Sequence, residues 1–117
     1  MIVLVCGGRN YADRQRVYTT LTKINDTKGI RKIVCGGAKG ADRLAADWAL
    51  ANNVNLCTYN ATWNTHGLSA GIKRNQLMLD REDIDLVVAF PGSRGTAHMK
   101  QLAQDYAIDV MEILNGS

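Results

Sequence analysis

Long apolar runs, paired cysteines and a basic leader are all missing from this sequence. Its continuous hydrophobic stretches are strand-sized, far below the roughly 20 residues that a membrane span needs. The first residues lack the charged-then-apolar pattern of a signal peptide. The three cysteines, Cys6, Cys35 and Cys57, form no CxxC pair and lie at or near the ends of apolar runs. We therefore expect a cytoplasmic protein with buried, reduced thiols and no membrane partner.

A strong excess of one charge is also absent. The formal net charge is +3, and the Lys and Arg residues are scattered rather than gathered in one block. This pattern favours a small anionic ligand over a long track for nucleic acid. Acidic residues do gather within 80–85, but without His or Cys at ligand spacing they are typical of a solvated helix end and turn. We predict no metal site and no cofactor.

What is present suits one globular domain over residues 1–117, of which 46% are hydrophobic and 21% charged. No linker or internal repeat interrupts the chain. Short apolar runs rich in β-branched residues predict strands, and several of them end in glycine. The predicted strands cover residues 1–6 (MIVLVC), 30–35, 54–59, 84–90 (IDLVVAF) and an edge strand at 109–114.

Helical spacing predicts helices between these strands. They cover residues 13–24 with Asp13 as the N-cap, a second helix opened by Asp42, and residues 70–79 and 96–106. Strands that alternate with helices form right-handed crossovers and a parallel sheet. We therefore predict an α/β protein, a Rossmann-like doubly wound five-stranded parallel sheet in the order 3-2-1-4-5 with helices on both faces. Ligands bind such sheets beyond the carboxyl ends of the strands, at the point where the strand order reverses.

Three glycine-rich turns are predicted at that edge of the sheet. Glycine lets an anion approach main-chain N–H groups, and the following helix N-terminus attracts negative charge. The last turn is predicted to hold phosphate, with Arg94 as counter-charge. The second turn could hold either a second anion or a ribose, through Lys39 and the Asp42 cap. The predicted contacts are Gly7, Gly8, Arg9, Gly36, Gly37, Lys39, Gly40, Asp42, Gly92, Ser93, Arg94, Gly95 and Thr96.

These turns differ from the common nucleotide motifs. None matches GxxxxGK[ST], and GGRNYAD is not GxGxxG, so ATP hydrolysis and ordinary NAD binding have little support. We therefore expect the crevice to bind a ligand that is smaller or less usual than ATP or NAD.

Aromatic and basic residues between 59 and 78 add further candidate contacts. Tyr59, Trp63 and His66 could stack on a base, whereas Arg74 and Asn75 could reach a phosphate and a ribose or base edge. In the alternative interpretation, Trp63 fills the edge of the core and Arg74 pairs with a carboxylate such as Asp42 or Asp80. His98, one turn into a predicted helix, is expected to be solvated.

Four stretches together resemble the YspA-like branch of the SLOG superfamily, whose relatives include the lonely-guy and DprA Rossmann-like domains. They are CGGRNYAD at residues 6–13, CGGAKGADRLAADWA at 35–49, TWNTHGLSAGIKRNQLM at 62–78 and VVAFPGSRGTAHM at 87–99. The resemblance covers nearly the whole chain. It implies a crevice that binds a nucleotide or a nucleotide-derived signal, for a sensor or a sequestering protein.

The same resemblance bears on catalysis. Lonely-guy enzymes release a base from a nucleoside monophosphate with an arginine in R-[KN]-x-x-M and a glutamate in PGGxGTxxE. Arg74 in RNQLM matches the arginine, but Met99 replaces the glutamate and Ser93 the middle glycine. Methionine has no charge to stabilise the oxocarbenium character of that transition state. A phosphoribohydrolase-like N-glycosidic hydrolase is therefore the alternative, with Arg74 orienting the substrate and Asp42 or Asp13 acting as acid or base.

Two further expectations come from the relatives. Single-stranded DNA binding, by analogy with DprA, is opposed by the modest charge. A homodimer is expected by analogy with lonely-guy proteins, with the apolar faces around Trp48 and Met78 shared between copies. The alternative is a monomer that buries both residues in its own core.

Overall fold

Strands and helices alternate along the chain in its computed structural model, which describes residues 1–59, 70–92 and 94–114. All five strands are parallel and form one sheet in the order β3-β2-β1-β4-β5. This arrangement confirms the predicted Rossmann-like fold and strand order. The elements are β1 (Ile2–Cys6), α1 (Arg14–Lys28), β2 (Lys32–Cys35), α2 (Ala41–Ala51), β3 (Asn55–Thr58), α4 (Ala70–Arg81), β4 (Leu86–Ala89), α5 (Arg94–Asp105) and β5 (Asp109–Glu112).

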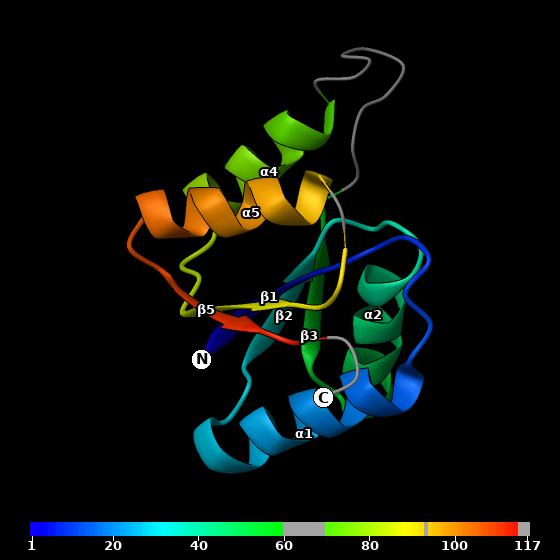
Figure 1. The fold of residues 1–117 in the computed structure, drawn as a ribbon. Helices are drawn as coiled ribbons and strands as arrows, with labels where there is room; N and C mark the ends of the chain where they lie inside the picture. The colour runs from blue at the N-terminus through cyan, green and yellow to red at the C-terminus, as the bar shows by residue number, and fades with distance from the viewer. Residues whose placement is uncertain (60–69, 93, 115–117) are drawn as a thin grey trace.

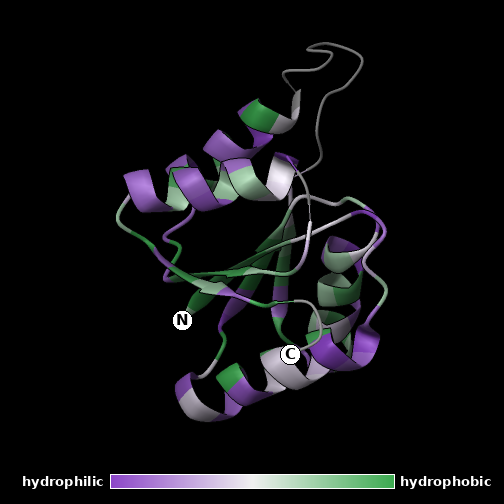
Figure 2. Cartoon of the chain, viewed as in Figure 1, coloured by the Kyte–Doolittle hydropathy of each residue, from purple (hydrophilic) through white to green (hydrophobic). Residues whose placement is uncertain are grey.

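The sheet is the middle of three layers. Helices α1 and α2 cover one face, and α4 and α5 cover the other (Figure 1). Successive side chains of β1 alternate between the two cores: Val3 and Val5 pack on the side of α1 and α2, and Leu4 packs on the side of α4 and α5. Both faces of the sheet are therefore buried under helices. Because every side chain of a central strand then faces a core, the strands are continuous hydrophobic runs. Figure 2 shows mainly hydrophobic strands between helices that carry many hydrophilic residues.

The helix boundaries differ in part from those predicted. Asp13 caps α1 as expected, because its carboxylate accepts a hydrogen bond from the Arg16 N–H at 3.0 Å. Helix α1 continues to Lys28, beyond predicted residue 24, and ends at Gly29 with φ 76°. The prediction that Asp42 caps α2 is wrong, because Gly40 is the N-cap and Asp42 lies inside the first turn. Helix α5 starts at Arg94, two residues before the predicted start.

The two apolar faces proposed for a dimer are filled within the chain itself. Trp48 is 1% exposed and Met78 is 2% exposed, and each packs into its own side of the core. The shared surface suggested by the sequence is therefore not available, and homodimerisation stays a prediction without that surface. No helix in the described ranges is long and apolar enough to cross a membrane.

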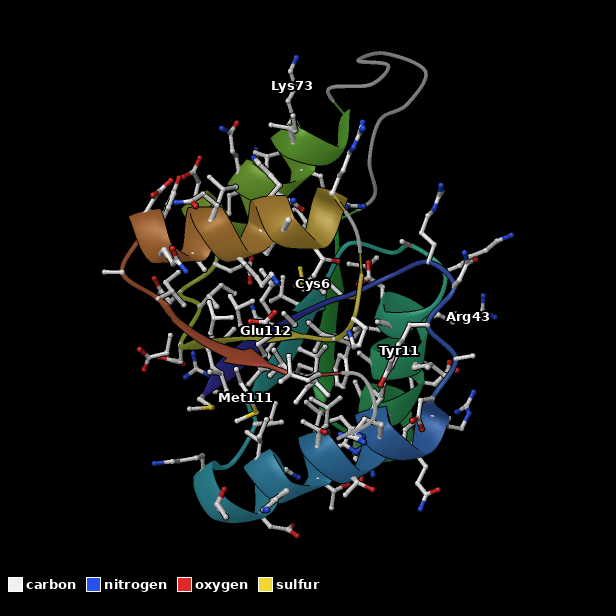
Figure 3. All side chains as sticks on the ribbon, in the orientation of Figure 1. Cys6, Tyr11, Arg43, Lys73, Met111 and Glu112 are labelled. Atoms are coloured by element: carbon white, nitrogen blue, oxygen red, sulfur yellow. The ribbon has the colours of Figure 1, made fainter. Side chains whose placement is uncertain are left out.

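All three cysteines are free thiols. Cys35 is fully buried, whereas Cys6 and Cys57 are partly buried. Burial, with a smaller contribution from the Asp42 charge, raises the pKa of Cys6 to about 12. Because the thiolate is the reactive form, Cys6 is held in its unreactive state. In Figure 3, Cys6 lies between the sheet and α5.

Candidate functional site

The turns that follow β1, β2 and β4 leave the sheet at the same edge (Figure 1), and a cleft of about 880 Å³ opens there. Strands β1 and β4 are neighbours at the centre of the sheet although they are far apart in the sequence, so this edge is the point at which the strand order reverses. Helices α4 and α5 contribute the opposite wall. The lining residues are Val5, Cys6, Gly7, Gly8, Arg9, Gly36, Gly37, Ala38, Lys39, Asp42, Gly71, Ile72, Arg74, Asn75, Met78, Arg94, Gly95, Thr96 and His98.

Most of the predicted contacts meet in this one cleft. Two predicted residues, Trp63 and Ser93, lie outside the described residues, as does His66. Among the described ones, Gly40 and Gly92 do not line the cleft. The structure brings together the remaining predicted residues, which are Gly7, Gly8, Arg9, Gly36, Gly37, Lys39, Asp42, Arg74, Asn75, Arg94, Gly95 and Thr96.

Gly40 and Gly92 hold the turns against one another. A Cβ on Gly40 would lie 2.1 Å from the Gly8 carbonyl oxygen, and one on Gly92 would lie 2.8 Å from the Gly8 nitrogen. Gly8 itself connects the three turns, since its N–H donates to the Pro91 carbonyl at 2.8 Å and its carbonyl accepts from the Ala41 N–H at 3.2 Å. Gly40 and Gly92 therefore allow the main chains of the three turns to approach one another closely, because neither has a side chain.

The hydrogen bonds between the turns limit the number of main-chain N–H groups that can bind an anion. The prediction that all three turns offer N–H groups is only partly correct, because three of those groups are already engaged. The Gly8 N–H donates to Pro91, the Ala41 N–H to Gly8, and the Ala38 N–H to Asp42. The first turn of α5 has no intrahelical partner for its N–H groups, as in any helix, and begins in the cleft.

Asp42 is a buried carboxylate on the cleft wall. Its side chain accepts a hydrogen bond from the Ala38 N–H at 3.2 Å, and the residue is 6% exposed. None of the ion pairs among the described residues includes it. Burial raises the pKa of Asp42 to about 6, against the smaller opposing effects of the Ala38 hydrogen bond and the Arg74 charge. A carboxyl group with this pKa can gain or lose a proton near neutral pH.

Arg74 reaches the cleft from α4 and lies flat against Gly36. A Cβ on Gly36 would lie 2.7 Å from the guanidinium carbon of Arg74, so only glycine leaves room for this approach. The Nη1 group donates to the Gly36 carbonyl at 3.3 Å. The Nε group is buried and has no hydrogen-bond partner among the residues that the structure describes. The alternative prediction of an ion pair with Asp42 or Asp80 is wrong, because neither pair is within ion-pair distance.

Asn75 and His98 form a polar pair between α4 and α5. The Asn75 amide nitrogen lies 3.1 Å from His98 Nδ1 and 3.4 Å from the Gly95 carbonyl, and Asn75 is 3% exposed. An amide that donates to Nδ1 leaves the proton of a neutral imidazole on Nε2. The expectation that His98 is merely solvated is therefore wrong, since it lines the cleft and is held by a buried partner.

Tyr59 does not face the cleft, contrary to the prediction that it stacks on a base. Its hydroxyl donates to Glu82 at 2.7 Å, and Glu82 also pairs with Lys32. The hydrogen bond to Glu82 is the main reason that the pKa of Tyr59 is raised to about 12. This side chain therefore ties β3 to the end of α4.

Helical spacing could have identified several residues that sequence reasoning missed. On α4, the missed residues Gly71 and Met78 lie at i and i+7. The predicted residues Arg74 and Asn75 lie at i+3 and i+4, so all four share one face of the helix. Gly95 and His98 are separated by three residues on α5 in the same way. The wider set of missed lining residues is Val5, Cys6, Ala38, Gly71, Ile72, Met78 and His98.

The cleft carries the positive excess of the chain. Four cationic side chains line it, against a single acidic one, Asp42; the cations are Arg9, Lys39, Arg74 and Arg94. The whole chain has 14 Lys and Arg and 11 Asp and Glu residues, which leaves ten of each sign elsewhere. The net charge of +3 is thus concentrated at the carboxyl edge of the sheet, where it raises the local concentration of anions.

The fold and its cleft define a Rossmann-like domain, and comparison with known families identifies the family. The chain matches the YspA, cpYpsA-related SLOG family over residues 1–66, which include β1 to β3 and the first two glycine-rich turns. The chain belongs to this family, so it is a nucleotide-related Rossmann-like protein. It is also similar to the Gene 61 protein of Mycobacterium phage D29, with 36% identity over 117 residues and 93% of each chain covered.

Proposed function

We propose that this chain binds a nucleotide or a nucleotide-derived ligand, with a phosphate group against the first turn of α5. The observation that carries the proposal is the composition of that turn. It contains no acidic residue and starts with Arg94, although a cation at the positive end of a helix is unfavourable on its own. A phosphate bound between Arg94 and the N–H groups at the start of the helix would relieve this repulsion and neutralise both.

The size and lining of the cleft support a ligand of nucleotide size. Its volume of about 880 Å³ lies within the range of roughly 300–1,000 Å³ that small-molecule sites occupy. Ile72, which is 47% exposed on the α4 wall, offers apolar surface for a base. Because the charges outside the cleft balance, a small anion is favoured over a nucleic-acid strand.

Substitution of Arg94 by glutamine is expected to weaken nucleotide binding by about tenfold or more, because it removes the charge nearest to the proposed phosphate. The measurement is isothermal titration calorimetry against the four ribonucleoside 5′-monophosphates, cyclic dinucleotides and ADP-ribose. Arg94 is exposed, so the variant should fold normally.

Arg43→Gln is the matched control. Arg43 is exposed on α2, does not line the cleft and points outward in Figure 3, so its substitution should change the affinity less than about twofold. Equal losses in the two variants would mean that the chain's total charge, and not this turn, attracts the ligand. No heat of binding with any of these compounds and folded protein would remove the proposed function.

A second function, hydrolysis of the N-glycosidic bond of a nucleoside monophosphate, is favoured by Asp42. A carboxyl group with a pKa of about 6 in the same cleft as Arg74 has the properties of a general acid. Met99, at the position of the lonely-guy glutamate, is fully buried and does not line the cleft. Chromatography of each monophosphate after long incubation tests this function, and the absence of free base at high protein concentration would exclude it.

A further inference from the structure

Two helix N-termini open on the cleft, and they differ in charge. Helix α5 has no acidic residue in its first turn, whereas α2 has Asp42 there. A carboxylate in the first turn already compensates the positive end of its own helix. The turn before α2 therefore differs electrostatically from the phosphate site proposed at α5.

Two main-chain N–H groups at the second turn already have hydrogen-bond partners. The Ala38 N–H donates to Asp42, and the Ala41 N–H donates to the Gly8 carbonyl. A phosphate placed at this turn would lose these donors and would face a carboxylate of like charge. Of the two uses left open by the sequence, a second anion is therefore the one that the geometry disfavours.

The Asp42 carboxylate on the cleft wall can accept hydrogen bonds from donor groups of a ligand. Asp42 is 6% exposed, accepts hydrogen bonds from the main chain at Ala38 and Gly36, and forms no ion pair among the described residues. Ionised, its two oxygens have about four lone-pair sites, so further donors can be accepted. A ligand ammonium group is disfavoured because four cationic side chains share the cleft. Neutral hydroxyl groups meet the requirement without that repulsion.

We propose that Asp42 accepts hydrogen bonds from the ribose hydroxyls of the ligand and so selects ribonucleotides over 2′-deoxyribonucleotides. This inference rests on the proposed function and assigns the sugar to the turn before α2 and the phosphate to α5. Carboxylates bind the vicinal hydroxyls of ribose in other Rossmann-like sites by the same chemistry. Arg74, on the facing helix, lines the same cleft and packs against Gly36 in the turn before α2, so its charge lies beside the proposed sugar site.

The test compares each of the four ribonucleoside 5′-monophosphates with its 2′-deoxy counterpart by isothermal titration calorimetry. The wild-type chain is expected to bind at least one ribonucleotide about tenfold or more tightly than its deoxy form, because a hydrogen bond to a charged group is lost. In Asp42→Asn this preference is expected to fall below about threefold. The affinity for the deoxynucleotide should fall less than that for the ribonucleotide, because the deoxy sugar keeps only the 3′-hydroxyl as a donor to Asp42.

Asp47→Asn is the matched control on the same helix. Asp47 pairs with Arg14 at 3.2 Å outside the cleft, so its substitution should leave the preference unchanged. Equal affinity of the wild-type chain for both sugars would overturn the inference while nucleotide binding stands. A preference that survives in Asp42→Asn would overturn it as well. Absence of binding by all eight nucleotides would overturn the inference together with the proposed nucleotide function.

Discussion

Gly40→Ala is expected to destabilise the chain by more than about 3 kcal/mol, which is a large loss for a single substitution. Gly40 has φ +76° and ψ −128°, a conformation that residues with a side chain rarely adopt and that strains them by about 1–3 kcal/mol. In addition, the new Cβ would lie 2.1 Å from the Gly8 carbonyl oxygen and 2.6 Å from that of Arg9. Both obstacles are main chain, and moving them would break the hydrogen bond from Ala41 to Gly8.

Gly29→Ala is the control that separates these two causes. Gly29 has the same φ of +76°, but no atom lies within 4 Å of its added Cβ. With ψ 111° its conformation is also one that side chains rarely adopt, so its loss should be limited to about 1–3 kcal/mol of backbone strain. Urea unfolding of the wild-type chain, Gly40→Ala and Gly29→Ala measures the loss in the free energy of unfolding for each variant. If Gly40→Ala lost no more than Gly29→Ala, the close packing of the turns would not contribute to stability.

Asp42→Asn is expected to make the chain more stable by up to about 3 kcal/mol at pH 7.5. Burial raises the pKa of this carboxyl to about 6 in the folded chain, against its ordinary value of 3.8 in the unfolded one. Between these values the unfolded chain has lost the proton while the folded chain keeps it. The carboxyl group therefore costs stability as the pH rises from about 4 to 6, and the full cost remains above pH 6.

The pH dependence of the gain is the decisive measurement. At pH 4 the folded Asp42 is protonated, so the advantage of asparagine should fall below about 1 kcal/mol. Asparagine keeps one acceptor oxygen, which can still accept the Ala38 N–H. Asp47→Asn should change the free energy of unfolding by less than about 1 kcal/mol at both pH values, because its ion pair is partly exposed.

A less stable Asp42→Asn at pH 7.5 would show that the carboxylate stabilises the fold, contrary to the burial argument. A gain combined with loss of ribose selection would instead identify Asp42 as a residue kept for binding at a cost in stability. Such opposition between stability and function is common at binding sites, where buried charge serves the ligand.

The sequence determined the layers of this protein and the edge at which its ligand site lies. The runs IVLVC and LVVA are apolar at every position, so both strands had to be buried on both faces. With helices between them, the handedness of the crossovers restricts the strand order. Glycine-rich turns after three strands then had to meet near the β1–β4 boundary. These conclusions depend on local sequence patterns, which can be read along a single chain, and on the general right-handedness of β-α-β crossovers.

Only the tertiary structure decided how the groups at that edge are used. Whether an N–H is free depends on partners far away in the sequence, as when Gly8 donates to Pro91 and accepts from Ala41. The same holds for Tyr59, which turns to Glu82, and for His98, which Asn75 holds at the cleft. The burial that raises the pKa of Asp42 is likewise a property of all the elements around it. Hydrogen-bond pairing and desolvation are set by neighbours in space, so sequence spacing alone does not specify them.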